Sequence, residues 1–140
     1  MERSSEQLTQ RFIQALRLLE REGTLDELMP LYRDDAEVGN VLEPSSLQGR
    51  EGARSFWTMY RNTFQAMESS FRSVIVSKDG AALEWGCIAT SRHGQQVEYA
   101  GVTVLEFREG QIARSWAYFD AAALGAQLRS PELVPFDPGA

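Results

Sequence analysis

Three glycine-containing turns between residues 71 and 120 constrain this chain more than any other feature. They are the segments 78–80, 92–94 and 109–111, and they separate four runs of strand-like residues. Because glycine adopts positive φ angles without steric cost, each turn favours a tight reversal of the chain. The sequence therefore predicts a meander of antiparallel strands. A curved sheet with helices on one face has its deepest cavity between the two layers, and we expect any site to lie there.

The residues before this meander carry the pattern of amphipathic helices. Apolar residues recur at helical spacing from Leu8 to Leu19, Ser4 and Gln7 form a capping-box pair ahead of them, and Gly23 follows as a stop signal. The predicted helices cover residues 5–22, 25–33 and 52–67, with a short strand over 36–41. The expected fold is therefore α+β, with about three N-terminal helices packed on a curved, mainly antiparallel sheet that encloses a pocket.

Strand and helix alternation assigns side chains to the two faces of the sheet. On the pocket face we expect Glu84, from the second long strand, among mostly apolar neighbours. The predicted ligand-binding residues are Phe12, Leu16, Trp57, Tyr60, Phe64, Thr103, Leu105, Ser115, Ala117 and Phe119. The opposite face is also apolar and has no helix to cover it, so we predict a homodimer through that face. Its expected centre comprises Trp85, Val102, Val104, Trp116 and Tyr118.

Length and composition narrow the function further. The 140 residues fit one domain over 1–130 and an irregular, proline-containing tail over 131–140. The net charge of −6 argues against nucleic-acid or anionic-membrane partners, which require clustered basic residues. No run approaches the roughly 20 apolar residues of a membrane span, so we expect a cytoplasmic protein. A single cysteine, Cys87, and a single histidine, His93, predict neither an intrachain disulfide nor a metal site, and no other cofactor is expected.

Three segments in a fixed order give the chain a family resemblance. They are residues 31–36 (LYRDDA), residues 47–51 (LQGRE) and the final strand from Gly110 to Asp120. With these segments the chain resembles the NTF2-like superfamily and, within it, the SnoaL-like and ketosteroid-isomerase-like branch. The resemblance implies a cone-shaped α+β fold with a buried pocket and, usually, dimers. It leaves the function open, because this fold hosts isomerases, polyketide cyclases, epoxide hydrolases, dehydratases and proteins without catalysis.

The catalytic sets of two branches are not intact in this chain. Steroid isomerases of the fold use a tyrosine, a carboxylate base and a protonated aspartate. The matching positions here are Phe12, Asn40 and Thr103. The positions that match the Arg and Asp residues of limonene-type epoxide hydrolases are Glu84, Gly86 and Ala117. Amide, hydroxyl and apolar side chains replace most of the required acids and bases.

The sequence therefore leaves two candidate functions. The first is a protein that binds a small apolar molecule without chemistry. The alternative is a cofactor-free isomerase, cyclase or dehydratase that acts on a small carbonyl or polycyclic compound. In that enzyme Glu84 is the expected acid or base, and Tyr60 or Asn40 polarises the substrate. Two or more polar groups that converge around Glu84 in the pocket favour the enzyme, and a wholly apolar pocket favours the binder.

Several candidate residues also have a purely structural interpretation. Glu84 could be an acid in the pocket or a member of an ion pair near the rim. Asn40 could contact a ligand or form an Asx turn. Asp120 precedes a helical stretch and fits an N-cap. His93 lies in a turn, where a solvated side chain is expected, and Cys87 fits a small buried hydrophobe on the outer face.

Overall fold

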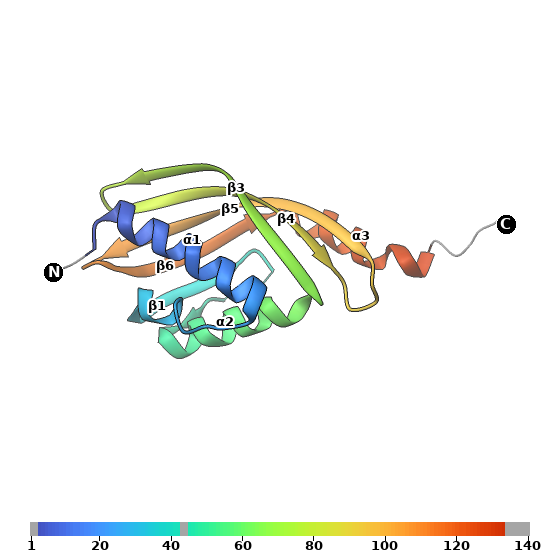
Figure 1. Ribbon diagram of the computed structural model, residues 1–140, viewed down its shortest axis with the longest axis horizontal. Coiled ribbons are helices and arrows are strands. Elements are labelled where there is room, and N and C mark those ends of the chain that lie inside the picture. The colour runs from blue at the N-terminus through green and yellow to red at the C-terminus, as the bar shows by residue number, and fades with distance from the viewer. Residues whose placement is uncertain (1–2, 43–44, 134–140) are drawn as a thin grey trace.

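The computed structural model describes residues 3–42 and 45–133 as an α+β fold, which confirms the predicted class (Figure 1). Its helices are α1 (Ser5–Glu22), the 3₁₀ helix η1 (Met29–Leu31), α2 (Gly49–Thr63) and α3 (Ala121–Leu133). Its strands are β1 (Tyr32–Asn40), β2 (Leu47–Gln48), β3 (Ala66–Ser77), β4 (Gly80–Thr90), β5 (Gln96–Arg108) and β6 (Gln111–Phe119). No helix in this described part of the chain is long and apolar enough to cross a membrane.

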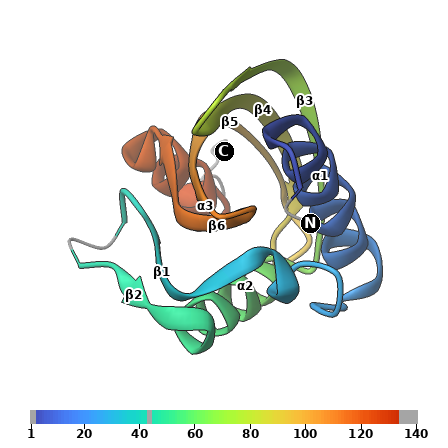
Figure 2. The ribbon, with the colours of Figure 1, turned by 90° about the vertical axis from the view of Figure 1, so that its left-hand side faces the viewer.

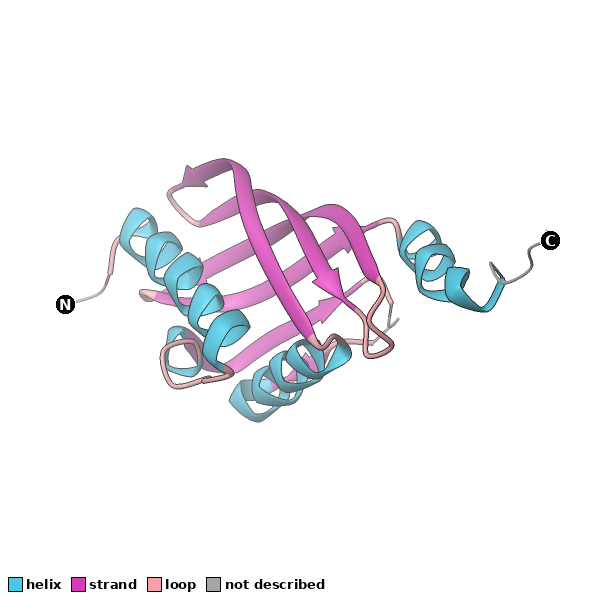
Figure 3. Ribbon diagram, turned by 45° about the vertical axis from the view of Figure 1, so that its right-hand side comes forward, coloured by secondary structure: helices cyan, strands magenta, loops and turns pink. Residues whose placement is uncertain are grey.

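One six-stranded sheet, in the order β2-β1-β6-β5-β4-β3, forms the body of the molecule. Strands β3 to β6 pair antiparallel in sequence order, as the three turns predict. Strand β1 pairs in parallel with β6, so the sheet is mixed. Figure 2 shows the sheet curving around an interior, with α1 at one side and α2 below. Figure 3 shows α3 set apart from these two helices, beyond the end of the sheet.

The interior divides into two apolar clusters. The larger one joins α1, η1 and α2 to the sheet, and its fully buried members include Phe12, Tyr32 and Ile112. The smaller one lies toward α3 and comprises Phe64, Met67, Cys87, Ala89, Val97 and Leu124. Burial of these side chains from water provides the main driving force for packing the helices on the sheet.

The first helix forms as its sequence predicts. At its start the hydroxyl of Ser4 accepts a hydrogen bond from Gln7 N at 3.1 Å, and Gln7 Oε1 accepts one from Ser4 N at 3.0 Å. These two bonds satisfy backbone donors that would otherwise lack partners. Gly23 ends the helix with φ of 76°, a left-handed conformation that glycine adopts without strain.

The predicted second helix over 25–33 is wrong. Residues 26–28 form a turn, η1 supplies a single 3₁₀ turn, and β1 already begins at Tyr32. Pro30 lacks the N–H that a longer helix needs, which limits the helical hydrogen bonds in this segment. The three predicted N-terminal helices are therefore two, α1 and α2, and the third α-helix, α3, is C-terminal.

The third predicted helix is correct in position but too long at its C-terminal end. Helix α2 ends at Thr63, because Phe64 is extended, with φ of −121° and ψ of 156°. Strand β3 then begins at Ala66, ahead of the strand-like run expected from Phe71. The side chains of this segment suit both structures, and pairing with β4 along the whole length of β3 decides for the strand.

The predicted faces of β4 are wrong by one residue. Glu84 pairs with Val102 and Trp85 pairs with Gly101. Directly opposed residues of an antiparallel pair project to the same face. Glu84 therefore lies on the outer face with Val102 and is exposed, whereas Trp85 projects inward. Because the segment 82–89 carries apolar or small side chains on both faces apart from Glu84, alternation alone cannot choose between the faces.

The same shift changes two further assignments. Cys87 is buried on the inner face, opposite Ser69 of β3 and Tyr99 of β5, and not on the outer face as predicted. Trp85 leaves the predicted dimer surface. The remaining members of that surface stay together, since Val102 pairs with Tyr118 across β5 and β6 and Val104 with Trp116.

The C-terminal end of the described chain is more helical than predicted. Asp120 Oδ1 accepts a hydrogen bond from Ala123 N at 2.9 Å, which confirms the predicted N-cap. Helix α3 continues to Leu133, so the irregular tail expected over 131–140 is wrong for its first three residues. Residues 134–140 of that predicted tail lie outside the described part of the chain.

Gly101 allows the close approach that places Trp85. A Cβ built at Gly101 would overlap the carbonyl oxygen of Tyr118 and would lie 2.8 Å from Cζ2 of Trp85. In contrast, a Cβ at Gly86, on the neighbouring strand, would meet no atom within 4 Å. The indole of Trp85 therefore occupies the space that any other residue at position 101 would fill.

Replacement of these two glycines tests the close approach. We expect Gly101→Ala to lower the free energy of unfolding by about 1–3 kcal/mol, because backbone and indole must both shift. Gly86→Ala is the matched control, and it should be neutral or stabilise by up to about 1 kcal/mol because alanine restricts the unfolded chain. Urea denaturation of both variants provides the measurement. Equal stabilities of the two variants would contradict the packing described for Trp85.

Candidate functional site

A cavity of about 480 Å³ lies between the sheet, α2 and the start of α3. Its lining comprises Leu16, Val38, Gly39, Asn40, Leu42, Ser45, Leu47, Phe56, Trp57, Met59, Tyr60, Thr63, Phe64, Ser69, Trp85, Tyr99, Thr103, Ala117, Phe119 and Leu124. None of these described lining residues has a charged side chain. The volume falls within the range of roughly 300–1,000 Å³ that is typical of small-molecule sites.

Most of the residues predicted for ligand binding border this cavity. Those that do are Leu16, Trp57, Tyr60, Phe64, Thr103, Ala117 and Phe119. The other three, Phe12, Leu105 and Ser115, are buried in the core beyond the cavity lining. Alternation predicted the face of these three residues correctly, but only the packing of the helices decides where the cavity ends.

Two groups of aromatic rings face the cavity. On α2 the ring centroids of Trp57 and Tyr60 lie 5.1 Å apart and the planes are nearly perpendicular, at 81°. On the sheet Trp85 and Tyr99 lie 5.4 Å apart at 88°, and Phe119 lies 5.6 Å from Tyr99. Edge-to-face pairs of this kind are favourable and hold the rings in defined orientations. The cavity therefore offers rigid aromatic surfaces on two sides.

A buried carboxylate lies behind one wall of the cavity. Glu20 is only 4% exposed, near the C-terminal end of α1. Its Oε1 accepts a hydrogen bond from Ser69 N at 2.9 Å, and its Oε2 accepts from Tyr60 Oη at 2.8 Å and from Ser69 Oγ at 2.5 Å. Three donors thus compensate for the loss of water around this carboxylate.

The cavity tyrosines next to this carboxylate stay protonated. Burial raises the pKa of Tyr60 well above its ordinary value, and the nearby charge of Glu20 raises it further. Burial also raises the pKa of Tyr99, mainly by removing the phenol from water. The pKa of the Cys87 thiol is raised by burial as well, which disfavours the thiolate needed by a nucleophile.

A second group of hydrogen-bonded side chains lies at the other end of the interior. Trp57 Nε1 donates to Tyr32 Oη at 2.9 Å, and Tyr32 Oη lies 2.9 Å from Ser115 Oγ. Burial raises the pKa of Tyr32 from 10.0 to about 12. These bonds fix the indole of Trp57 between the core and the cavity. Ser115, which was predicted to contact a ligand, is instead a member of this hydrogen-bonded group.

Asn40 and Thr103 provide the polar groups on the sheet side. Asn40 Oδ1 accepts from Leu42 N at 2.9 Å, so the amide forms the Asx turn that the sequence left as an alternative. Thr103 Oγ1 accepts from Trp85 Nε1 at 2.9 Å. Since the oxygen of Thr103 receives this bond, its own proton remains available to an acceptor in the cavity.

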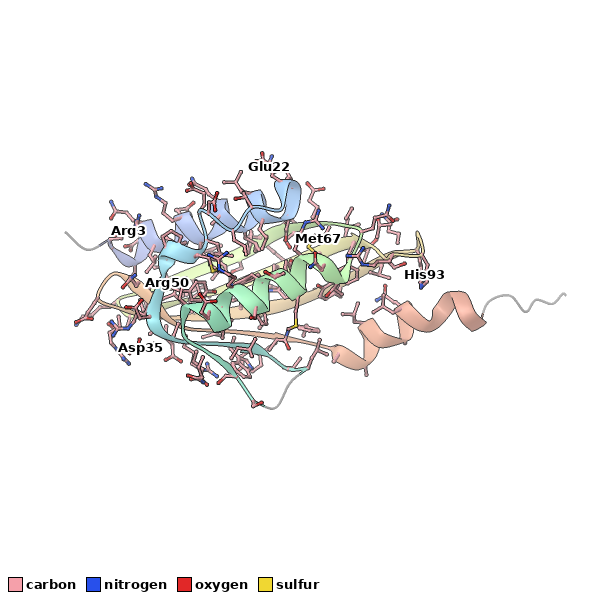
Figure 4. The ribbon with its side chains drawn as sticks, turned by 90° about the horizontal axis from the view of Figure 1, so that it is seen from below. Arg3, Glu22, Asp35, Arg50, Met67 and His93 are labelled. Atoms are coloured by element: carbon pink, nitrogen blue, oxygen red, sulfur yellow. The ribbon has the colours of Figure 1, made fainter. Side chains whose placement is uncertain are left out.

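The predicted catalytic acid is not at this site. Glu84 is exposed on the outer face and does not line the cavity, for the reason of register given above. His93 is exposed in the turn between β4 and β5, and Figure 4 shows it at the tip beside α3. Within the described ranges no group of three or more His, Cys, Asp or Glu side chains could hold a metal ion.

Sequence reasoning missed Glu20, although its position carried a signal. Glu20 follows Leu16 by four residues and Phe12 by eight, so it continues the buried stripe of α1. A charged residue on the apolar stripe of a helix is more informative than one on the exposed face, since charged residues are rarely buried without partners. The missing information was the partner, Ser69, which is 49 residues away.

The fold and the cavity together define a class of small α+β proteins with an apolar cavity between helices and a mixed sheet. A family model, the SnoaL-like domain, matches residues 9–115. The chain belongs to this SnoaL-like family, as its three sequence segments indicated.

Solved structures share the fold at low sequence identity. A candidate isomerase from Rhodopseudomonas palustris is 16% identical, with a TM-score of 0.77 and with 86% of this chain and 95% of that chain covered. A candidate SnoaL-like polyketide cyclase from Jannaschia sp. CCS1 is 17% identical, with a TM-score of 0.73 and coverage of 87% and 94%. TerC, co-crystallised with polyporic acid, is 18% identical, with a TM-score of 0.75 and coverage of 88% and 98%. No curated protein matches the chain.

Alkaline titration tests the burial of Tyr32, Tyr60 and Tyr99. In the folded protein their raised pKa values keep the phenols neutral, so ionisation occurs first in the unfolded chain. Stability from these groups is complete below about pH 10 and is lost as pH rises toward the folded values. For Tyr32 alone the free energy of unfolding should fall by up to about 1.4 kcal/mol per pH unit between about pH 10 and 12.

The measurement is tyrosinate absorbance near 295 nm, compared with the same protein in guanidinium chloride. The native curve should lag behind the denatured one by three tyrosines. Coincident curves would show that these phenols are accessible to solvent.

Proposed function

We propose that this protein binds a small, flat, uncharged and largely apolar molecule in the cavity. The observation that carries the proposal is the lining, in which aromatic groups of α2 and of the sheet face one space of about 480 Å³. A planar ring system fits between such surfaces and gains by leaving water. A charged ligand would lose its hydration there without an opposite charge in the lining, so a neutral one is favoured.

Two relatives are described in terms of small organic molecules. A SnoaL-like neighbour is described as a candidate polyketide cyclase, and TerC was crystallised with polyporic acid. At identities below 20% these structures support the fold, and the cavity lining of this chain supports the ligand class.

A cofactor-free isomerase, cyclase or dehydratase is the second candidate function. The hydrogen bond between Tyr60 and the buried carboxylate of Glu20 favours it, because such a pair can take up a proton from a bound molecule. Glu84 has no part in this candidate. Exchange of the α-hydrogens of 2-tetralone in D₂O, followed by NMR, separates the two functions. An enzyme of this type accelerates the exchange, and a binding protein leaves the buffer rate unchanged.

Titration with N-phenyl-1-naphthylamine tests the binding function. The fluorescence of this neutral dye rises in apolar surroundings, and we expect saturable binding of one dye per chain. Ala117→Phe should weaken binding about tenfold or more, which corresponds to about 1.4 kcal/mol, because the new ring occupies the cavity. Ala100→Phe is the matched control, since Ala100 is exposed on the outer face opposite Gly86.

Melting curves for both variants confirm that each is folded at the temperature of the titration. Binding that does not saturate, or equal affinities of the two folded variants, would refute binding in this cavity.

We also propose a homodimer through the outer face of β5 and β6. Val102, Val104, Trp116 and Tyr118 form an apolar row there, and Tyr118 is 48% exposed in the single chain. Apolar surface of this kind favours burial against a second copy, and a specific interface should bury more than about 1,000 Å² in total. A twofold axis would place this row of one chain against the same row of its partner, as in a symmetric pair.

Sedimentation of charged variants tests the dimer. Tyr118→Glu should convert a dimer to monomer at micromolar concentration, because a buried carboxylate without a partner opposes association. Ile75→Glu is the control, since Ile75 is 66% exposed on β3, three strands from β6. It should leave the dimer intact. A wild-type protein that sediments as a monomer at high micromolar concentration would exclude this proposal.

A further inference from the structure

At the polar end of the cavity, two hydroxyl groups donate their protons to one buried carboxylate. Tyr60 and Ser69 are the two hydroxyl residues of the lining that also contact Glu20. Both hydroxyls lie within hydrogen-bond distance of the same carboxylate oxygen, at 2.8 Å and 2.5 Å. A carboxylate oxygen has no proton to give, so each hydroxyl donates toward Glu20 in these two short contacts. The two hydroxyl oxygens also lie 3.4 Å from each other, which is a longer and weaker contact than either bond to Glu20.

This arrangement leaves only oxygen lone pairs toward the cavity. A hydroxyl has one proton and two lone pairs. With both protons engaged by Glu20, the oxygens of Tyr60 and Ser69 can accept hydrogen bonds from a ligand but cannot donate to it. A ligand carbonyl placed here would face two acceptors, whereas a ligand hydroxyl would find partners for its proton.

Burial makes the arrangement hard to reverse. Glu20 and Ser69 are 4% and 7% exposed, so water is largely excluded from the hydrogen bonds between them. The amide of Ser69 adds a third bond to Glu20, which holds the carboxylate against β3. Turning either hydroxyl toward a ligand would remove a charge-assisted hydrogen bond, and such bonds are about twice as strong as neutral ones.

We propose that Glu20 selects the ligand by its hydrogen-bonding character, so that the protein prefers a flat apolar molecule with a hydroxyl group, a phenol or an enol, directed at Tyr60 and Ser69. This inference rests on the proposed binding function and deepens it. Glu20 is a positioning residue, because it acts through the two hydroxyls and does not itself line the cavity. Tyr60 is then an acceptor for the ligand, not the polarising donor that the sequence suggested.

The other polar groups of the lining do not produce the same preference. Thr103 keeps a proton for an acceptor, since its oxygen receives the bond from Trp85. Tyr99 also carries a phenol proton. A hydroxyl and an ether can both accept from these two residues. Thr63 Oγ1 also donates its proton elsewhere, to Met59 O at 2.7 Å, but Thr63 is exposed. The group around Glu20 is the buried one that distinguishes a ligand that donates from one of the same shape that does not.

Calorimetric titration with two matched probes tests the inference. The probes are 2-naphthol, which donates a hydrogen bond, and 2-methoxynaphthalene, which has nearly the same shape and cannot donate. We expect the wild-type protein to prefer 2-naphthol about tenfold, because its hydroxyl donates to one of the two buried acceptors and the ether donates to neither. In Glu20→Gln the side-chain amide donates to one hydroxyl oxygen and accepts fewer protons, so the preference should fall to about twofold or reverse.

Two further variants keep the test decisive. Tyr60→Phe removes one acceptor and keeps the carboxylate of Glu20 with its two hydrogen bonds from Ser69, and it should reduce the preference even if Glu20→Gln fails to fold. Glu84→Gln makes the same chemical change at an exposed carboxylate of the outer face, and it should retain the tenfold preference.

The outcomes separate this inference from the proposed function. Equal affinities of the two probes for wild-type protein would overturn the selection by Glu20 and leave the binding function in place. Failure of both probes and of the neutral dye to bind would overturn the binding function itself. A preference for 2-naphthol that survives in both Tyr60→Phe and folded Glu20→Gln would assign the selection to another group.

Discussion

One buried carboxylate, Glu20, connects three elements at one wall of the cavity. It belongs to α1, and its oxygens accept hydrogen bonds from Tyr60 of α2 and from the backbone and hydroxyl of Ser69 in β3. A carboxylate removed from water is strongly destabilising unless donors replace the water. These hydrogen bonds therefore favour one spacing of α1, α2 and β3. That spacing sets the shape of the cavity beside them.

The same contacts give the cavity its chemical character. The walls of the cavity consist of aromatic rings and aliphatic side chains. Its polar groups lie at two separate positions and differ in their hydrogen bonding. At one end the protons of Tyr60 and Ser69 are held by Glu20, while on the sheet Thr103 accepts from Trp85 and keeps its own proton. Under the proposed function, a neutral ring system with a hydroxyl group satisfies these groups. In the proposed binding mode, the acceptor for a ligand hydroxyl is itself hydrogen-bonded to the carboxylate of Glu20.

Sequence reasoning succeeded for the parts of the site that depend on local patterns. Thr103, Ala117 and Phe119 were assigned to the inner face correctly, because β5 and β6 are joined by a tight turn at Gly110 and alternate clearly. It failed for Glu84, where both faces of β4 look alike and only the pairing with β5 distinguishes them. It also extended a helix through Pro30, where turn and helix share the same short-range signals.

The sequence by itself determined the α+β class, the extent of α1, the meander of β3 to β6 and the family, because caps, turns and periodicity act between residues that are close along the chain. Tertiary structure alone decided which face of β4 is buried, where the cavity ends and which acid lies inside. These features depend on cross-strand register and on contacts such as that of Glu20 with Ser69, 49 residues apart. Such contacts leave no local pattern, since their free energy arises only when distant segments exclude water together.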